Sequence, residues 1–166
     1  LKIEAEAKLK AEAEARLKIE AEAKADAEEK VADAARLAEE YAQRAADACK
    51  LATTTLGGIP LPQSTGFLGI LGYGGPPDMP ATRAHAAKDR CEVCATKAKE
   101  LLAAYKKSPM QATMDNLKAN AEKAEQEVEE VEKEVKAHKE EEEAKVKAEE
   151  EAKLKAEAEA KAEVEA

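Results

Sequence analysis

The sequence contains few of the side chains from which a globular enzyme builds its core. Its 166 residues include no Trp, one Phe, three Tyr and two His. Leu, Ile, Val and Phe together number 25, and the formal net charge is −9. So few large apolar side chains with so high a charge are typical of disordered chains. The abundance of Ala, Glu, Lys and Leu, which are strong helix formers, instead predicts long helices.

The charge and the absence of several motifs exclude whole classes of function. Nucleic-acid binding needs a basic stripe, and none is visible in this acidic chain. A membrane-surface helix is disfavoured because no helix face is rich in basic residues. No Ser/His/Asp arrangement, phosphate-cradling glycine motif or poised carboxylate pair is recognisable. We therefore expect a protein that is not an enzyme and that needs no cofactor or metal.

Glycine and proline are confined almost entirely to one segment. All seven Gly and five of the six Pro lie between Gly57 and Pro80, and neither residue recurs after Pro109. Because both residues interrupt helices, we predict an all-α chain that forms one elongated domain over residues 1–166. Its expected elements are two long helices, one shorter helix and a long Gly/Pro-rich apolar loop, in the order helix 3–55, loop 56–80, helix 81–107 and helix 109–164.

Both ends of the chain carry a low-complexity pattern in which small apolar and charged residues alternate. One octet occurs at 9–16, recurs with small changes at 17–24, and occurs again at 154–161. Alternation is a strand pattern, but Ala, Glu and Lys favour helices over strands, so we predict helical arms. Glu residues stand four positions before a base throughout, as in Glu4–Lys8 and Glu141–Lys145, and each such pair adds about 0.2–0.5 kcal/mol to a helix. An eight-residue repeat drifts around a helix, so we expect the arms to bury little.

Nearer the middle of the chain, apolar residues recur at alternating steps of three and four positions. This spacing is the seam of a coiled coil. We therefore predict a three-helix bundle packed around Ala, covering about 31–55, 84–105 and 114–135. The predicted seams are Val31, Ala35, Ala38, Ala42, Ala45, Cys49 and Ala52 in the first helix, Ala84, Ala87, Cys91, Cys94, Ala98, Leu101 and Tyr105 in the second, and Met114, Leu117, Ala121, Ala124, Val128, Val131 and Val135 in the third.

The relative directions of the helices follow only in part from the sequence. Ser108, Pro109 and Gln111 predict a helix that starts at Pro109, with Ser108 as its cap in a capping box. The short connection before it makes the second and third helices antiparallel. The first helix can pair antiparallel with the third, which sets the two arms side by side, or with the second, which points the arms in opposite directions. We expect the first arrangement, because two solitary overhanging helices would be poorly ordered.

The three cysteines permit several interpretations. Cys91 and Cys94 lie within one predicted helix, Cys49 lies on the seam of another, and His85 is near. A zinc site is disfavoured because a Cys-x-x-Cys ligand pair usually sits on a turn, and a redox dithiol because no strand pattern surrounds it. A disulfide from Cys49 to Cys91 or Cys94 is a candidate and would favour oppositely pointing arms. The alternative is three small side chains that fill seam positions.

The segment from 51 to 77 contains 27 consecutive uncharged residues. Its prolines and glycines exclude a transmembrane helix, because they would break the backbone hydrogen bonding. A fusion-peptide-like role for 67–73 is one alternative, and folding back over the Ala seams is another. Loops of this length are often functional, so we identify a candidate surface for a partner. Its residues are Phe67, Leu68, Ile70, Leu71 and Tyr73, and Leu61 would join them in folding back.

The remaining polar features have simpler interpretations. His85 and His138 are isolated, and an isolated His on a helix is ordinarily a solvated or seam residue. The acidic run at 140–143 predicts a solvated helix face, since carboxylates on one helix cannot surround a calcium ion. The chain starts at Leu1 instead of Met, so we expect a processed product whose secretory or anchor signals lie outside it.

The octets at 1–8, 9–16, 17–24 and 154–161, together with the Gly-rich break between helices, resemble the glutamic acid/alanine-rich surface proteins of African trypanosomes. The resemblance covers nearly the whole chain and is carried by composition and layout. Similar runs occur in periplasmic energy-coupling rods and in cytoskeletal coiled coils. Neither of these accounts for the apolar loop or for cysteines on facing seams.

The resemblance implies an abundant surface antigen of the insect-stage parasite, attached to the cell membrane by a GPI lipid anchor beyond Ala166. Its partners would be neighbouring coat molecules, and its role would be to form a packed layer of rods that shields the membrane. The family is structurally similar to the trypanosome haptoglobin–haemoglobin receptor, which implies, as an alternative, a helical-bundle receptor for a host or vector protein. An intracellular coiled-coil rod is a third alternative.

Overall fold

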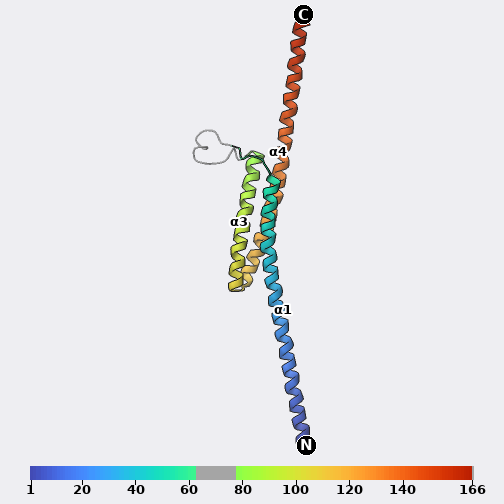
Figure 1. Cartoon of the computed structure of the whole chain (residues 1–166), viewed down its shortest axis with the longest axis vertical. Helices are drawn as coiled ribbons and strands as arrows, with labels where there is room; N and C mark the ends of the chain where they lie inside the picture. The colour runs from blue at the N-terminus through green and yellow to red at the C-terminus, as the bar shows by residue number, and fades with distance from the viewer. Residues whose placement is uncertain (63–77, 166) are drawn as a thin grey trace.

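The computed structural model describes residues 1–62 and 78–165, and in these ranges all the regular secondary structure is helical. The helices are α1 (Lys2–Leu56), α3 (Pro80–Lys107) and α4 (Gln111–Glu165). All three pack together in one short bundle near the middle of the molecule. From this bundle α1 extends to one end and α4 to the other (Figure 1). The prediction of an elongated three-helix bundle is confirmed, and the segment from 63 to 77 lies outside the described residues.

Local sequence explains where each helix begins and ends. Gly57 ends α1 at φ 57°, a left-handed conformation that glycine adopts without steric cost, and its N–H donates to the Thr53 carbonyl at 3.1 Å. Pro80 occupies the first turn of α3, where a missing N–H costs nothing. Lys106 and Lys107 in the last turn of α3 complement the negative end of its dipole.

The predicted start of the third helix at Pro109 is wrong by two residues. Ser108 ends α3 in an extended conformation, with φ −146° and ψ 95°, instead of capping α4. A residue before proline is driven out of the helical region by contact with the proline ring, which explains this conformation. The first intrahelical bond of α4 runs from the Met114 N–H to the Met110 carbonyl at 3.1 Å.

The expected antiparallel pairing of the two arms is also wrong. The chain runs along the bundle in α1, returns in α3 and runs forward again in α4, so α1 and α4 are parallel and their free ends point in opposite directions (Figure 1). Ion pairs record this order: Glu39 of α1 lies 3.1 Å from Lys106 of α3, whereas Arg44 of α1 pairs with Glu125 of α4, 81 positions later. The reason is that arms of Ala and charged residues bury little apolar surface, so their pairing contributes little free energy.

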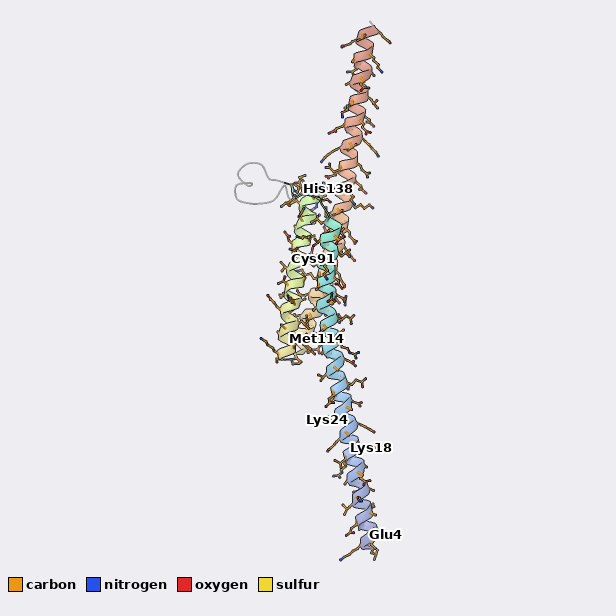
Figure 2. The ribbon with its side chains drawn as sticks, in the orientation of Figure 1. Glu4, Lys18, Lys24, Cys91, Met114 and His138 are labelled. Carbon is orange, nitrogen blue, oxygen red and sulfur yellow. The ribbon has the colours of Figure 1, made fainter. Side chains whose placement is uncertain are left out.

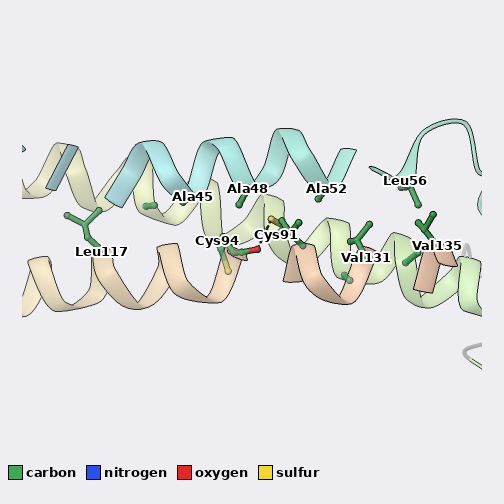
Figure 3. Close-up of a cluster of buried hydrophobic side chains, with 14 of the residues drawn as sticks. Ala45, Ala48, Ala52, Leu56, Cys91, Cys94, Leu117, Val131 and Val135 are labelled. Atoms are coloured by element: carbon green, nitrogen blue, oxygen red, sulfur yellow. Dashed lines mark hydrogen bonds between the residues drawn. The ribbon is translucent and has the colours of Figure 1, made fainter. Parts of the chain in front are cut away.

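The core of the bundle is built mainly from alanine. The seams predicted for α3 and α4 are confirmed: every predicted residue is buried except Leu101, which is partly buried and packs against the core. The largest fully buried side chains are Leu117, Val131 and Cys91. Figure 3 shows Leu117, Val131 and Val135 of α4 facing the small residues of α1. Small side chains let the helices approach closely, so water is excluded by close contact between the helices and not by large side chains.

The seam predicted for α1 is only partly correct. Its buried residues include Ala48 and Leu56, whereas the predicted Val31 is 65% exposed and Ala35 is also exposed. The bundle is only as long as the 28-residue α3, so α1 has no neighbour before about Ala34. The predicted packed region of 31–55 therefore begins a turn too early.

The two arms are solitary helices. All residues in 1–33 and 139–165 are exposed, and Figure 2 shows their side chains radiating into solvent on every side. None of the Glu–base pairs expected at a spacing of four closes to 4.0 Å in these described arms, and Lys145 contacts Glu142 at 2.9 Å instead of Glu141. Such exposed pairs gain little energy from holding one geometry. No helix in the described ranges is long and apolar enough to cross a membrane.

Candidate functional site

The base of the 63–77 segment is held against the bundle by contacts from both sides. Ile59 is partly buried against the core, and its carbonyl accepts a hydrogen bond from His85 Nε2 at 2.8 Å. Across the segment, Arg83 Nη1 donates to the Asp78 carbonyl. His85, expected to be a solvated or seam residue, thus bonds to the backbone that follows α1. Leu61 is exposed instead of folding back over the bundle. The other residues proposed to cover the bundle or meet a partner (Phe67, Leu68, Ile70, Leu71 and Tyr73) lie outside the described residues.

An ion pair between the partly exposed Arg83 and the buried Glu134 joins α3 to α4 at the same end of the bundle. Arg83 Nε lies 3.0 Å from Glu134 Oε1, and Glu134 is 4% exposed. The hydrogen bond to Glu134 is the main cause of a pKa of Arg83 above its ordinary value. Sequence analysis missed this pair, and the only signal was the position of Glu134 directly before the seam residue Val135. A carboxylate buried there is tolerated because the guanidinium compensates its charge.

Removing this partner is expected to destabilise the bundle. Arg83→Ala leaves the Glu134 carboxylate buried without a counter-ion, and we expect the thermal midpoint to fall by about 5 °C or more. Lys106→Ala is the matched control, because its partner Glu39 has a side chain that is 57% exposed and remains hydrated. Scanning calorimetry of both variants checks the prediction, and equal shifts would contradict a special role for burial.

The three cysteines meet where α1 packs on α3. Cys91 and Cys94 are buried and Cys49 is partly buried, all as free thiols. Cys91 Sγ donates to the Ala124 carbonyl of α4 at 3.3 Å. Both Cys91 and Cys94 therefore occupy core positions in the seam, as the small-residue interpretation predicts. A disulfide from Cys49 to either of them stays a prediction, and the observed antiparallel α1–α3 pairing is the arrangement that such a bridge would favour.

Burial makes the thiols of Cys91 and Cys49 poor nucleophiles. Desolvation raises the pKa of Cys91 from 9.0 to about 11, with smaller contributions from the neighbouring thiols and from Glu127 and Glu92. Desolvation, with a smaller effect of Glu92, also raises the pKa of Cys49. Because the thiolate is the reactive form of cysteine, these shifts oppose a catalytic or metal-binding role. Within the described ranges no group of three or more His, Cys, Asp or Glu side chains is placed to hold a metal ion.

The raised pKa of Cys91 predicts a loss of stability at high pH. The unfolded thiol releases its proton near pH 9 and the folded thiol near pH 11, so the contribution is complete below pH 9 and is lost as the pH rises to 11. A difference of two pKa units corresponds to about 2–3 kcal/mol in the free energy of unfolding. Urea unfolding at several pH values checks this in the wild type and in Cys91→Ala, which lacks only this thiol. Parallel pH profiles for the two proteins would contradict the prediction.

A shallow groove of about 660 Å³ runs between α1 and α3. Alanines and Leu102 form its apolar floor, Cys49 lies along it, and Lys50, Lys99 and Lys106 stand at its edge. The groove is open because, among the described residues, no further helix covers this side of α1 and α3. Nothing among the described residues indicates what would occupy it.

The structure thus brings together the three cysteines, and no catalytic constellation surrounds them in the part of the chain that it describes. The acidic run at 140–143 is exposed, as expected of a solvated face, and His138 is half-buried where α4 leaves the bundle (Figure 2). The most informative described features are mechanical: a small bundle, a fixed base for one segment and two exposed arms. No family model, curated protein or solved structure matches the chain.

Proposed function

We propose that this protein is a structural rod of a surface coat, and not an enzyme. In this role it stands away from a membrane, packs beside neighbouring copies and shields what lies beneath. The observation that supports the proposal is the pair of solitary helical arms, which leave the bundle at opposite ends and carry the chain far beyond the size of a compact domain.

The geometry suits a spacer. Because Arg44 lies beside Glu125 in a parallel pair, one path follows α1 up to Arg44 and continues in α4 from Glu125. That path contains about 82 helical residues and spans about 120 Å. A compact chain of this length would have a diameter of only about 40 Å. The bundle that joins the two arms is narrow, because many of its core residues are alanine.

The charge of the arms also suits dense packing. Glu and Lys or Arg are interspersed along each arm, and every described arm residue is exposed. The arms therefore stay hydrated and have no broad apolar face through which to aggregate. In the proposed coat the attachment is a GPI lipid anchor outside this sequence, and the partners are neighbouring coat molecules. The resemblance of the octets to the trypanosome surface proteins supports this setting.

Scattering in solution tests the rod itself. We expect a radius of gyration of about 30 Å, somewhat below the roughly 35 Å of a uniform thin rod of about 120 Å because the three helices overlap in the bundle, against about 15 Å for a compact domain with the same number of residues. Small-angle X-ray scattering at low protein concentration measures it. A value near that of the compact domain would show that the arms fold back and would contradict the spacer role.

The location of the protein in the cell tests whether it belongs to a surface coat. An antibody raised against the bundle should stain intact cells before permeabilisation, and treatment with a phospholipase that cleaves GPI anchors should release the antigen into the medium. An internal marker protein, stained only after permeabilisation, is the control. Staining of the rod that also requires permeabilisation would overturn the coat and favour the intracellular coiled-coil rod.

A receptor is the second candidate function, and the base of the 63–77 segment is the observation that favours it. Ile59 is held by His85, and Asp78 by Arg83, so both flanks of the segment are attached to the bundle. We propose that this segment contacts a host or vector protein. Phe67→Ala with Tyr73→Ala should then abolish binding of that protein without changing helical circular dichroism. If the protein binds no partner, or if the double variant binds as the wild type does, this candidate is overturned.

A further inference from the structure

The two ends of the chain carry two copies of one segment. At an offset of 145 positions, residues 1–20 and 146–165 are identical at 13 of 20 positions. Composition and the octet repeat explain the matching Ala, Glu and Lys: at an offset of 137 positions, residues 9–28 match 146–165 at 14 of 20 positions, but there Val164 stands opposite Ala27. At an offset of 145, all three large apolar residues of the second copy match apolar residues of the first: Val146 with Leu1, Leu154 with Leu9, and Val164 with Ile19. Their uneven spacing of eight and then ten positions therefore favours this register, although Ile3 and Leu17 of the first copy stand opposite alanines.

The structure places both copies in the same environment. Each is a regular helix beyond the bundle, and every described residue in both copies is exposed. The matched residues Leu9 and Leu154 are each 66% exposed. Neither copy contacts another part of the described chain, so the repetition is not explained by packing within one unit.

The directions of α1 and α4 allow one copy of the segment to lead out of a bundle and the other to lead into the next bundle. Because α1 and α4 are parallel, the second copy leaves the bundle in the direction in which the first copy enters it, at the opposite end (Figure 1). No Gly or Pro occurs from 110 to 166 or from 1 to 56. A helix that leaves one bundle through the segment can therefore enter a second bundle without a break.

We propose that this unit is joined end to end with further copies of itself in a linear array. In this array residues 146–165 of one unit are the entering segment of the next, equivalent to residues 1–20. A single helix then serves as α4 of one bundle and as α1 of the following bundle. The proposal rests on the rod function proposed above but not on its location at a cell surface, so the tests of the two can fail separately.

The array has a defined period. The offset between the copies is 145 residues, and the register between the parallel α1 and α4 is 81 residues, taken from Arg44 and Glu125. The distance from one bundle to the next is the difference between these two numbers, 64 helical residues, which is about 96 Å. In α4 the last half-buried residue is His138, and in α1 of the next unit the first is Ala34. About 40 residues of single helix, roughly 60 Å, lie between these two positions. Successive bundles therefore do not collide.

Side-by-side overlap of arms from separate copies is less favoured by the same observations. The octet repeat turns by about 80° around the helix at each step, so Leu9 and Leu17 form no continuous apolar stripe for a neighbouring helix. An arm that buries little has little to gain from a partner. A covalent junction needs no such surface, because the backbone of one helix continues.

Peptide mass spectrometry of the protein from its native source tests the junction. Trypsin cleaves after Lys161, and the following residues are Ala-Glu-Val-Glu-Ala. In the array we expect this sequence to continue as Glu-Ala-Lys and then to resemble residues 25–33, and an antibody against the bundle should detect a chain of several units on a denaturing gel. An unrelated continuation, or a chain of one unit that associates only under native conditions, would overturn the proposal.

The length of a two-unit chain tests the continuous helix. Residues 1–145 followed by residues 1–166 should extend the particle by about 96 Å relative to one unit, measured by electron microscopy or scattering. The control carries Ala13→Pro in the second of the two joined units, where a proline breaks the joining helix while leaving both bundles intact. We expect the control to be bent and shorter. A two-unit chain that lengthens by much less, or that the proline does not change, would show that the units fold back and would overturn the proposal.

Discussion

Leu117→Ala is expected to lower the free energy of unfolding by about 2–5 kcal/mol. Leu117 is fully buried and is one of the three largest fully buried side chains in the described bundle. Its removal leaves a cavity in a closely packed core, which adds to the lost transfer free energy of the side chain. Because small domains are stable by only about 5–15 kcal/mol, this change removes a large share of the total.

Leu154→Ala is the matched control for this prediction. It makes the same chemical change on the same helix, but at a position that is 66% exposed, so we expect an effect within about 0.5 kcal/mol. Urea unfolding should be followed by tyrosine fluorescence, since Tyr105 is buried in the bundle and the arms contain no tyrosine. Equal losses at the two positions would contradict the core described for α4.

Ala52→Leu is expected to destabilise the bundle by about 1–3 kcal/mol through overpacking. Ala52 is fully buried on α1 and lies beside Val131 of α4 (Figure 3). Leucine has nearly the helix propensity of alanine, so the loss would come from the three extra carbons that the closely approached helices cannot accept.

Ala27→Leu separates overpacking from any effect on the helix itself. Ala27 is exposed in the arm of the same helix, and we expect the substitution there to leave the free energy of unfolding unchanged within about 0.5 kcal/mol. The same urea experiment measures both variants. A stabilised Ala52→Leu protein would mean that the core contains space that leucine fills, and the close approach of α1 and α4 would then be wrong.

The seams of α3 and α4 could be predicted because their apolar residues stand out from a charged background. Met114, Leu117, Val128, Val131 and Val135 are large apolar residues on one face of α4, so one periodic set is unambiguous. The seam of α1 was ambiguous for the opposite reason. Between 32 and 52 nearly every second residue is alanine, and several faces of the helix satisfy the same spacing.

Among the candidate sites, the sequence indicated the cysteine cluster but not the ion pair. Cys49, Cys91 and Cys94 are seam residues, so periodicity alone placed them in the core. Glu134 looked like any other charge on a strongly charged helix. Its burial depends on Arg83, which lies 51 positions away in sequence and reaches it only because α3 packs antiparallel to α4.

The sequence by itself determined the three helices of the described residues, their bounds to within about two residues and the helical character of the arms. These properties are local: they follow from helix propensity and from the positions of glycine and proline. Tertiary structure alone decided that α1 and α4 run parallel, which face of α1 is buried and that the arms point apart. The arms look alike and would permit either pairing, so their direction depends on the small difference in packing free energy between two arrangements. Only contacts across the alanine core supply that difference.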